Sequence, residues 1–361
     1  MSPEDQSFPR LECPAPDTHR YEYLADPAPK SIREMEQKKY FFALALHQCA
    51  HVLPRLMGSV VEAIRFLGPQ NCALSVVEGR STDGTFEILS LLQQNLTEAS
   101  IEYFFESSDI DPSQNRIQAL ADIRNLALKP LRNNFDRFSQ DTTVIFLNDV
   151  AICMEDILEL IHQRMFQEAD MTCAMDWTFV GPDPTFYDVW IARGMTGDTF
   201  FNIPEDGSWD SAWNLFWNDE QSRTSLRAGR PFQVFSCWNG GVAFTARPIT
   251  EGIVKFRTHT IEECYQGEPK LFCKDLWYHG YGKIAVVPSV NLEYSDDAAK
   301  KIKALKGYVS RWVSGDGETT RIGWQAEPPG LVKCMPTYTE QVFVPWDEGL
   351  PRKNGTGEVD E

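Results

Sequence analysis

Positive charge is scarce in this chain of 361 residues. It has 34 lysine and arginine residues against 52 aspartate and glutamate residues, so its formal net charge is −18. Proteins that bind nucleic acid usually present a basic face to the phosphate backbone. We therefore expect no nucleic-acid partner for this chain.

Long apolar runs are also missing. No stretch approaches the roughly 18 consecutive apolar residues that a membrane-spanning helix needs. The first residues, 1–30, are polar and rich in proline, unlike a signal peptide with its apolar centre. We expect no membrane span in this chain.

Several catalytic signatures are absent. The sequence has no G-x-S-x-G elbow, no CxxC pair and no glycine-rich phosphate loop after a strand. His47 and His51 have the spacing of a zinc protease, but Gln48 stands where the catalytic glutamate is needed. We interpret this segment as a polar loop at the end of a strand.

The nine cysteines give only a partial indication of redox state. Because nine is odd, at least one thiol is free or pairs between chains. Cys237, Cys264 and Cys273 are candidates either for a disulfide in an oxidising lumen or for buried thiols. The sequons at Asn95 and Asn354 favour a secretory lumen only slightly.

Tryptophan is absent from the first 176 residues, although ten occur between Trp177 and Trp346. The first part alternates continuous apolar runs with helical patterns, as expected for parallel strands covered on both faces. We predict strands at 40–46, 73–77, 101–105, 142–147 and 171–175, and helices at 52–67, 86–96, 116–131 and 155–168. The fold class is therefore α/β, with a Rossmann-like, doubly wound, mostly parallel sheet. Further apolar runs lie at 241–244 and 283–287, and a lysine-rich helix is expected at 298–306.

Acidic and amide side chains follow the predicted strands, where ligands bind in such sheets. Glu78 could accept two N–H groups from a guanine edge, and Asp149 could hold a hard divalent cation. Arg124 precedes the fourth strand and could reach a diphosphate. The alternative stays open that Glu78, Asp83 and Asp149 only cap helices or stabilise turns.

Several longer motifs resemble the fungal capsule-associated mannosyltransferase family, which includes the cryptococcal α-1,3-mannosyltransferase and belongs to glycosyltransferase family 69. The resemblance covers roughly residues 11–295. It rests on Glu78-x-x-Ser81-x-Asp83-Gly84-Thr85, Asp122-x-Arg124-Asn125, Phe146-Leu147-Asn148-Asp149-Val150, Phe186-Tyr187-Asp188-x-Trp190-x-x-Arg193, Ser236-Cys237-Trp238-Asn239-Gly240 and Cys273-Lys274-Asp275-Leu276-Trp277. The last two segments are the most specific.

The resemblance implies a GT-A-type enzyme with an acceptor-binding C-terminal half. We expect an irregular arm at 1–36, a nucleotide-sugar-binding half at 37–176, an acceptor-binding half of the same domain at 177–346 and a polar tail at 347–361. Known members are mostly type II proteins of the secretory pathway. The expected location is therefore the Golgi or secretory lumen, with an anchor that this chain lacks.

Site residues follow from the same motifs. The donor nucleotide is expected at Glu78, Gly79, Arg80, Asp83, Arg124, Asn125 and Asn148. GT-A enzymes usually hold their metal with Asp-x-Asp, but the run here is Asn148-Asp149-Val150. We therefore assign Mn²⁺ or Mg²⁺ to Asp149, His279 and the donor diphosphate, while His279 as an ordinary core histidine remains an alternative.

The remaining roles concern transfer. Asp275, Asp188 and Arg193 are the catalytic candidates, although Asp188 and Arg193 could instead form a structural ion pair. Trp238 and Asn239 are expected to bind the acceptor, through an indole face and an amide, together with Asp275.

The leading hypothesis is retaining α-1,3-mannosyl transfer from GDP-mannose to an α-mannoside acceptor in fungal polysaccharide synthesis. One alternative is the same fold with a UDP-sugar donor, for example in xylosyl transfer. Another is a non-catalytic, glycan-binding factor for polysaccharide assembly or export. The missing second carboxylate after Asn148 keeps the last alternative open.

Overall fold

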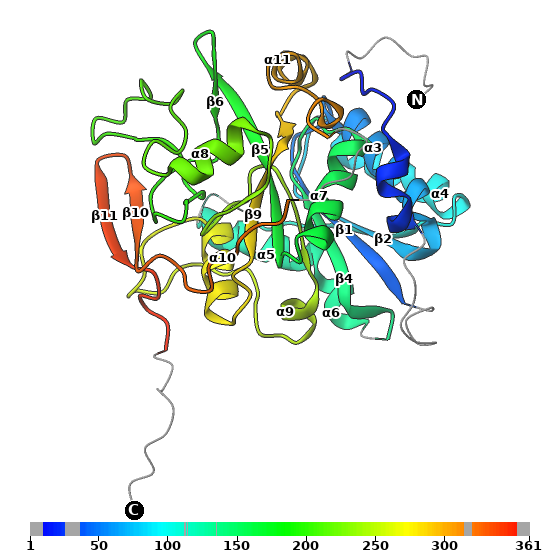
Figure 1. Cartoon of the computed structure of the whole chain (residues 1–361). Coiled ribbons are helices and arrows are strands. Elements are labelled where there is room, and N and C mark those ends of the chain that lie inside the picture. The colour runs from blue at the N-terminus through cyan, green and yellow to red at the C-terminus, as the bar shows by residue number, and fades with distance from the viewer. Residues whose placement is uncertain are drawn as a thin grey trace, which may run out of the picture.

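A nine-stranded mixed sheet forms the centre of the molecule in the computed structural model, which describes residues 10–25, 37–111, 113, 115–134, 136–313 and 320–351. The strand order is β3-β2-β1-β4-β8-β5-β9-β7, and β6 pairs with β5. Figure 1 shows helices packed around this twisted sheet. The strands are β1 (Lys38–Leu46), β2 (Cys72–Glu78), β3 (Glu102–Ser107), β4 (Phe138–Leu147), β5 (Met171–Val180), β6 (Asp183–Phe186), β7 (Phe232–Gln233), β8 (Gly241–Thr245) and β9 (Ile284–Leu292).

Parallel pairing joins β3, β2, β1 and β4, and β5 is parallel to β9. Successive residues of β1 enter opposite cores: Phe41 and Ala43 belong to one buried cluster, whereas Phe42 and Leu44 belong to the other. This alternation explains the continuous apolar runs, because both faces of each strand are covered.

Helices cover both faces. One cluster receives side chains of α3 (Leu53–Leu67), α4 (Thr85–Glu98) and α7 (Met154–Phe166). The other receives those of α5 (Arg116–Ala127), α6 (Lys129–Asn133), α9 (Arg247–Thr250) and α10 (Glu268–Tyr278). This arrangement confirms the predicted α/β class with a doubly wound, mostly parallel sheet.

Two details differ from the sequence prediction. The single helix expected at 116–131 is divided at Leu128, because Pro130 occupies the first turn of α6 and cannot continue an earlier helix. Strand β5 runs past Asp176 to Val180, so one strand crosses the tryptophan boundary.

The antiparallel strand β8 lies between β4 and β5. The residues directly before it, 238–240, therefore lie at the carboxyl ends of β4 and β5. The Asn148 N–H donates to the Gly240 carbonyl over 2.9 Å, which fixes this segment beside the end of β4.

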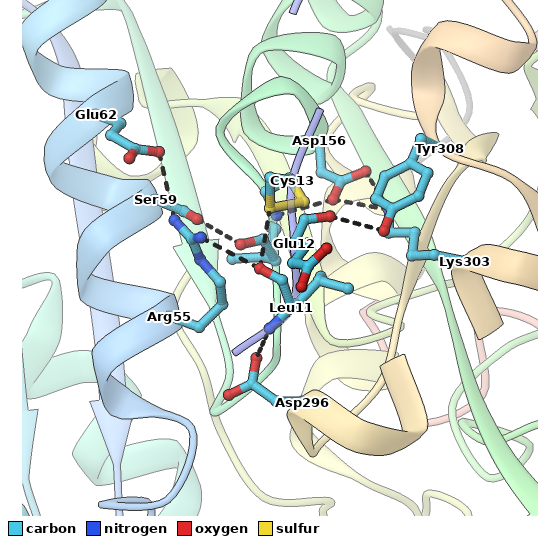
Figure 2. The surroundings of a disulfide bond; sticks show 12 residues. Leu11, Glu12, Cys13, Arg55, Ser59, Glu62, Asp156, Asp296, Lys303 and Tyr308 are labelled. Atoms are coloured by element: carbon cyan, nitrogen blue, oxygen red, sulfur yellow. Dashed lines mark hydrogen bonds and ion pairs between the residues drawn. A yellow bond between two sulfur atoms is a disulfide. The ribbon is translucent and has the colours of Figure 1, made fainter. Parts of the chain in front are cut away.

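The described part of the N-terminal arm is anchored rather than free. It contains a 3-10 turn, η1 (Thr18–Tyr21), and the short helix α1 (Glu22–Ala25), so this part is more regular than expected. A disulfide joins Cys13 to Cys153 at the start of α7. Figure 2 shows this bond between α3 and α11 (Asp296–Lys306), with the Leu11 N–H donating to Asp296 over 2.6 Å.

Two more disulfides, Cys173–Cys237 and Cys264–Cys334, join distant segments. Cys237 and Cys264 thus have partners that the sequence did not indicate, whereas Cys273 is a buried thiol, as are Cys49 and Cys72. The described chain ends with the hairpin of β10 (Leu331–Thr337) and β11 (Glu340–Pro345), and most of the predicted tail, 352–361, lies outside it. No helix within the described ranges has the length and apolar character to cross a bilayer.

Candidate functional site

The loops after β1 and β2 are joined to each other at one end of the sheet. The Gly79 N–H donates to the Leu46 carbonyl over 3.0 Å, and His47 Nδ1 contacts the Gly79 carbonyl. The Ala50 N–H donates to Asp83 Oδ2 over 2.9 Å. These bonds place the His47–His51 loop, a polar strand-end loop as predicted, against the Glu78–Thr85 segment.

The two acidic residues of this segment are used mostly inside the protein. Glu78 is buried, and its carboxylate accepts from the Ser81 N–H at 2.6 Å and the Ser107 hydroxyl at 3.0 Å. Asp83 accepts hydrogen bonds from Thr85 as well as from Ala50. Burial raises the pKa of Asp83, but these hydrogen bonds outweigh that effect, so the pKa is lowered. The bidentate guanine contact expected of Glu78 therefore has no free carboxylate edge in this structure.

Arg80 brings an exposed positive charge to the loop after β2. It follows the buried Gly79, adopts a left-handed backbone conformation with φ of 55°, and lies 3.2 Å from Asp111. Arg80 thus points out of the loop, where a nucleotide could reach it.

Arg124 is the centre of a second group, formed beside the end of β4. Its Nε donates to Glu268 Oε1 over 2.8 Å, and Nη1 lies 3.4 Å from Asn148 Oδ1. The guanidinium carbon is 4.5 Å from the centre of the Trp238 ring and 5.7 Å from that of Phe256. The Trp238 Nε1–H also donates to Asn148 Oδ1 over 3.0 Å, so the predicted residues Arg124, Asn148 and Trp238 do come together.

Asp149 lies next to this group. Burial raises the pKa of Asp149, while the nearby charges of His51, Arg124 and His47 act in the opposite direction. The electrostatic surroundings of Asp149 thus combine burial with opposing positive charge, of which that of Arg124 is permanent.

A pair of acidic side chains lies where β5 meets β9. Asp176 is fully buried; its Oδ2 accepts the Tyr294 hydroxyl at 2.7 Å, and its Oδ1 has no hydrogen-bond partner. Asp188 Oδ2 accepts the Asn239 N–H at 2.9 Å. Burial raises the pKa of both carboxyls, and the charge of Asp188 adds to the shift of Asp176.

Neither Trp238 nor Asn239 is accessible to an acceptor in this structure. Trp238 is only 1 % exposed and packs against Arg124, Phe146, Phe256 and Phe272. Asn239 is fully buried, and its amide donates to the Ala174 carbonyl over 2.8 Å. Their predicted contacts with a sugar have no free surface here; both instead shape the turn before β8, where Asn239 has a φ of 55°.

Two other predicted residues, Arg193 and Asn125, serve the scaffold. Arg193 is buried and donates to the carbonyls of Lys333, Val189 and Ala192, and no ion pair joins it to Asp188 within the described residues. Asn125 clamps the chain at Phe256 through hydrogen bonds of 2.8 and 3.2 Å. Each side chain holds a neighbouring segment in place.

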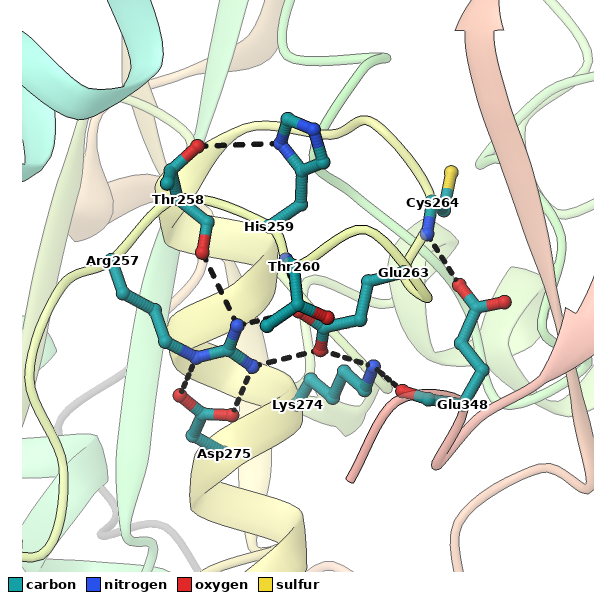
Figure 3. A network of polar contacts seen from close by, with 9 residues as sticks. All are labelled: Arg257, Thr258, His259, Thr260, Glu263, Cys264, Lys274, Asp275 and Glu348. Atoms are coloured by element: carbon teal, nitrogen blue, oxygen red, sulfur yellow. Dashed lines mark hydrogen bonds and ion pairs between the residues drawn. The ribbon is translucent and has the colours of Figure 1, made fainter. Parts of the chain in front are cut away.

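Asp275 belongs to the polar network in Figure 3. Arg257 donates to both of its oxygens, at 2.7 and 2.8 Å, and also contacts Glu263, which Lys274 contacts at 2.7 Å. This bidentate pair occupies the carboxylate that was expected to act as a base or to bind the acceptor.

His279 is separated from Asp149. It caps the C-terminal end of α10, whereas Glu268 at the other end contacts Arg124. A helix of 11 residues places its two ends about 16 Å apart. Within the described residues, no three His, Cys, Asp or Glu side chains are grouped to hold a metal ion. The predicted Asp149–His279 ligand pair is therefore not assembled in this structure.

Sequence reasoning missed Glu268 and Tyr294. Glu268 is 3 % exposed and pairs with Arg124. Its signal was available: Gly267-Glu268-Pro269 is a typical helix start, and a helix start on this side of the sheet faces the site. Tyr294 carried no local signal, because its role depends on the pairing of β9 with β5.

Comparisons with known proteins identify the family to which this chain belongs. The family model described as cryptococcal mannosyltransferase 1 matches residues 39–275. The alpha-1,3-mannosyltransferase CMT1 of Cryptococcus neoformans is 34 % identical over 325 residues, covering 84 % of this chain and 69 % of that protein.

Among solved structures, TarS residues 1–349 from S. aureus has a TM-score of 0.42 and 14 % identity, covering 74 % of this chain and 64 % of that one. The mannosyltransferase PcManGT from Pyrobaculum calidifontis, in complex with GDP-Man and Mn²⁺, has a TM-score of 0.41 and 10 % identity, covering 74 % and 60 %. The chain thus spans less than two thirds of either structure.

Proposed function

Because the chain belongs to the cryptococcal mannosyltransferase 1 family and is a mannosyltransferase, we propose that it moves mannose from GDP-mannose to the 3-hydroxyl of an α-mannoside. The observation that carries the proposal is the group around Arg124, at the carboxyl end of β4 where donors bind in open α/β sheets. Among the described residues, no hydrogen bond engages Arg124 Nη2, so this nitrogen is available to a diphosphate.

The proposed transfer retains the configuration at the sugar carbon. The bond from C1 to the diphosphate breaks, a bond from C1 to the acceptor oxygen forms on the same face, and the departing diphosphate takes the acceptor proton. Arg124 stabilises the leaving charge, and its contact with Glu268 and the aromatic rings holds it in place. Asp188, whose pKa is raised by burial and lowered by the charge of Arg124, would contact the donor sugar.

A divalent cation, Mn²⁺ or Mg²⁺, is part of the proposal. Asp149 could bind such a cation. Burial raises the pKa of its carboxyl, and a positive partner would stabilise the ionised carboxylate. The described side chains supply no complete ligand set, so the donor diphosphate would provide the other oxygens. When bound, the cation would neutralise charge on the leaving diphosphate.

The secretory or Golgi lumen is the proposed location. Three disulfides join segments that are far apart in sequence, and such bonds persist in oxidising compartments. They support a lumenal protein and speak against a reducing compartment.

A donor panel tests the function. Purified protein is incubated with GDP-mannose and with UDP-sugars, with and without Mn²⁺, and transfer to a mannoside is measured. We expect turnover with GDP-mannose that falls at least 100-fold in Asp149→Asn, since a transition-state charge contact is worth roughly that much. Turnover only with UDP-sugars contradicts the donor assignment, and glycan binding without turnover in any mixture contradicts catalysis.

A further inference from the structure

Tyr187 is an exposed aromatic residue beside the candidate site. It directly precedes Asp188, and 48 % of its surface is exposed, whereas Trp238 and Phe256 are buried. A sugar ring can reach the face of an exposed side chain but not that of a buried one. Tyr187 thus has the accessibility that the predicted platform, Trp238, lacks.

The ring of Tyr187 is held in position. It packs against Tyr294, with ring centres 4.9 Å apart, and its main-chain N–H donates to the Asp176 carbonyl over 3.1 Å. Tyr294 is in turn fixed by its hydroxyl bond to Asp176 and by His51 Nε2, 3.1 Å from its carbonyl oxygen. A ring that is already ordered loses little conformational entropy when a ligand binds.

The position in the sheet favours the acceptor rather than the nucleotide. The loops expected to hold the nucleotide follow β1 and β2, on one side of β4. Tyr187 pairs through its main chain with the end of β5, on the other side of β4. Besides burial, the charges of Asp176, Asp188 and Asp149 raise the pKa of Tyr187. Tyr187 also directly precedes Asp188 in the chain, and its main chain is bonded to Asp176.

We propose that Tyr187 is the stacking platform for the pyranose ring of the acceptor, with Tyr294 holding it in place. One face of a pyranose exposes C–H groups that pack on an aromatic ring, while its hydroxyls reach polar neighbours. The inference rests on the proposed function for the identity of the sugar, and it assigns to Tyr187 a specificity role within that reaction.

Binding measurements test this without requiring turnover. Methyl α-mannoside is titrated into the full chain in the presence of GDP, and ligand-observed NMR gives the dissociation constant. Tyr187→Ala is expected to weaken binding about 10-fold, and Tyr187→Phe to stay within about 2-fold, because the ring and not the hydroxyl makes the contact. Tyr23→Ala is the matched control, since Tyr23 is 45 % exposed but lies on α1.

Kinetics separate a platform from a structural role. A platform raises the acceptor KM in Tyr187→Ala and leaves GDP affinity and kcat within about 3-fold. Unchanged mannoside binding in Tyr187→Ala, or no saturable binding by the wild type, overturns the inference. Binding that depends on Tyr187 without transfer from GDP-mannose would instead refute only the proposed function.

Discussion

The guanidinium of Arg124 lies over the indole ring of Trp238, 4.5 Å from its centre, and both side chains reach the same oxygen of Asn148. The Trp238 ring, which was expected to bind a sugar, instead holds the guanidinium of Arg124 in position. A planar guanidinium can stack and hydrogen-bond at once, which an ammonium group cannot do.

Arg124→Lys should therefore weaken donor use, although this substitution keeps the positive charge. The lysine keeps the charge but loses the contact with Glu268 and the stacking, so we expect kcat/KM for GDP-mannose to fall about 10- to 100-fold. Arg247→Lys is the control, because in the described part of the chain Arg247 forms one ion pair, with Asp141, which is 3.7 Å long and half-exposed. Equal kinetics for Arg124→Lys and the wild type would contradict the assignment.

The Cys173–Cys237 disulfide should affect both stability and activity. Cys237 directly precedes Trp238, and the bond fixes this turn to β5. Replacing both cysteines by alanine is expected to lower the free energy of unfolding by about 2–4 kcal/mol and to reduce kcat, which denaturant titration and initial rates measure.

Cys264–Cys334 provides the comparison. This bond joins the segment before α10 to β10, away from the turn. Its removal should cost a similar amount of stability with little change in kcat at a temperature where the protein stays folded. If the two double variants lose the same activity, the special role of Cys237 is wrong.

Local sequence patterns were sufficient for most of the sheet, though not for β6 and β7, and they were not sufficient for the site. The continuous apolar runs of β1, β2 and β4 arise because each strand packs on two cores. The local pattern therefore reflects the burial of both faces of the sheet. Asn148 and Asp149 were found because strand ends lie together in any parallel sheet, and Arg124 because it lies on the helix before the fourth strand. Their placement needed no knowledge of long-range side-chain contacts.

The roles of Trp238, His279 and Asp275 depended on exactly such contacts. The order of the motifs placed all three residues in the acceptor half. In the structure, Trp238 is buried, His279 lies at the opposite end of α10 from the Arg124 group, and Asp275 is paired with Arg257. The type of a residue determines which chemistry its side chain can perform. Whether the side chain is free to perform it is decided by neighbours that are distant in sequence.

Metal dependence distinguishes Asp149 from His279. Asp149→Asn should raise the Mn²⁺ concentration needed for half-maximal activity by 10-fold or more, because a charged ligand becomes neutral. His279→Ala should leave that concentration within about 2-fold, since His279 is exposed at the far end of α10. Activity titrations after chelator treatment measure both, and a large shift in His279→Ala would restore it as a ligand.

Asn95 provides a test of the secretory location. It is exposed within α4, Leu96 packs into the core, and Thr97 completes the sequon. Secreted from a eukaryotic host with Asn354→Gln in place, the chain should carry one glycan, which amidase treatment removes and Asn95→Gln prevents. Asn95 follows the start of α4 by about 15 Å, so the glycan should leave activity unchanged. An unmodified secreted chain would speak against this prediction.

Glu155 should make stability depend on pH. It is 3 % exposed, and its Oε1 has no hydrogen-bond partner. Burial, with the charges of Asp156 and Glu159, raises its pKa from 4.5 to about 7. Between these values the folded protein holds a proton that the unfolded chain has released, so the contribution of Glu155 is fully present below pH 4.5 and is lost as the pH rises to 7.

Glu155→Gln removes this titration. We expect the variant to gain about 1–3 kcal/mol of unfolding free energy relative to the wild type on going from pH 5 to pH 7.5, an amount reduced from the full linkage value because the site is partly screened. Urea titrations at several pH values measure the difference, and Glu62→Gln, at a half-exposed position, serves as the control. A difference between Glu155→Gln and the wild type that stays constant with pH would mean that Glu155 is ionised in the folded protein throughout this range.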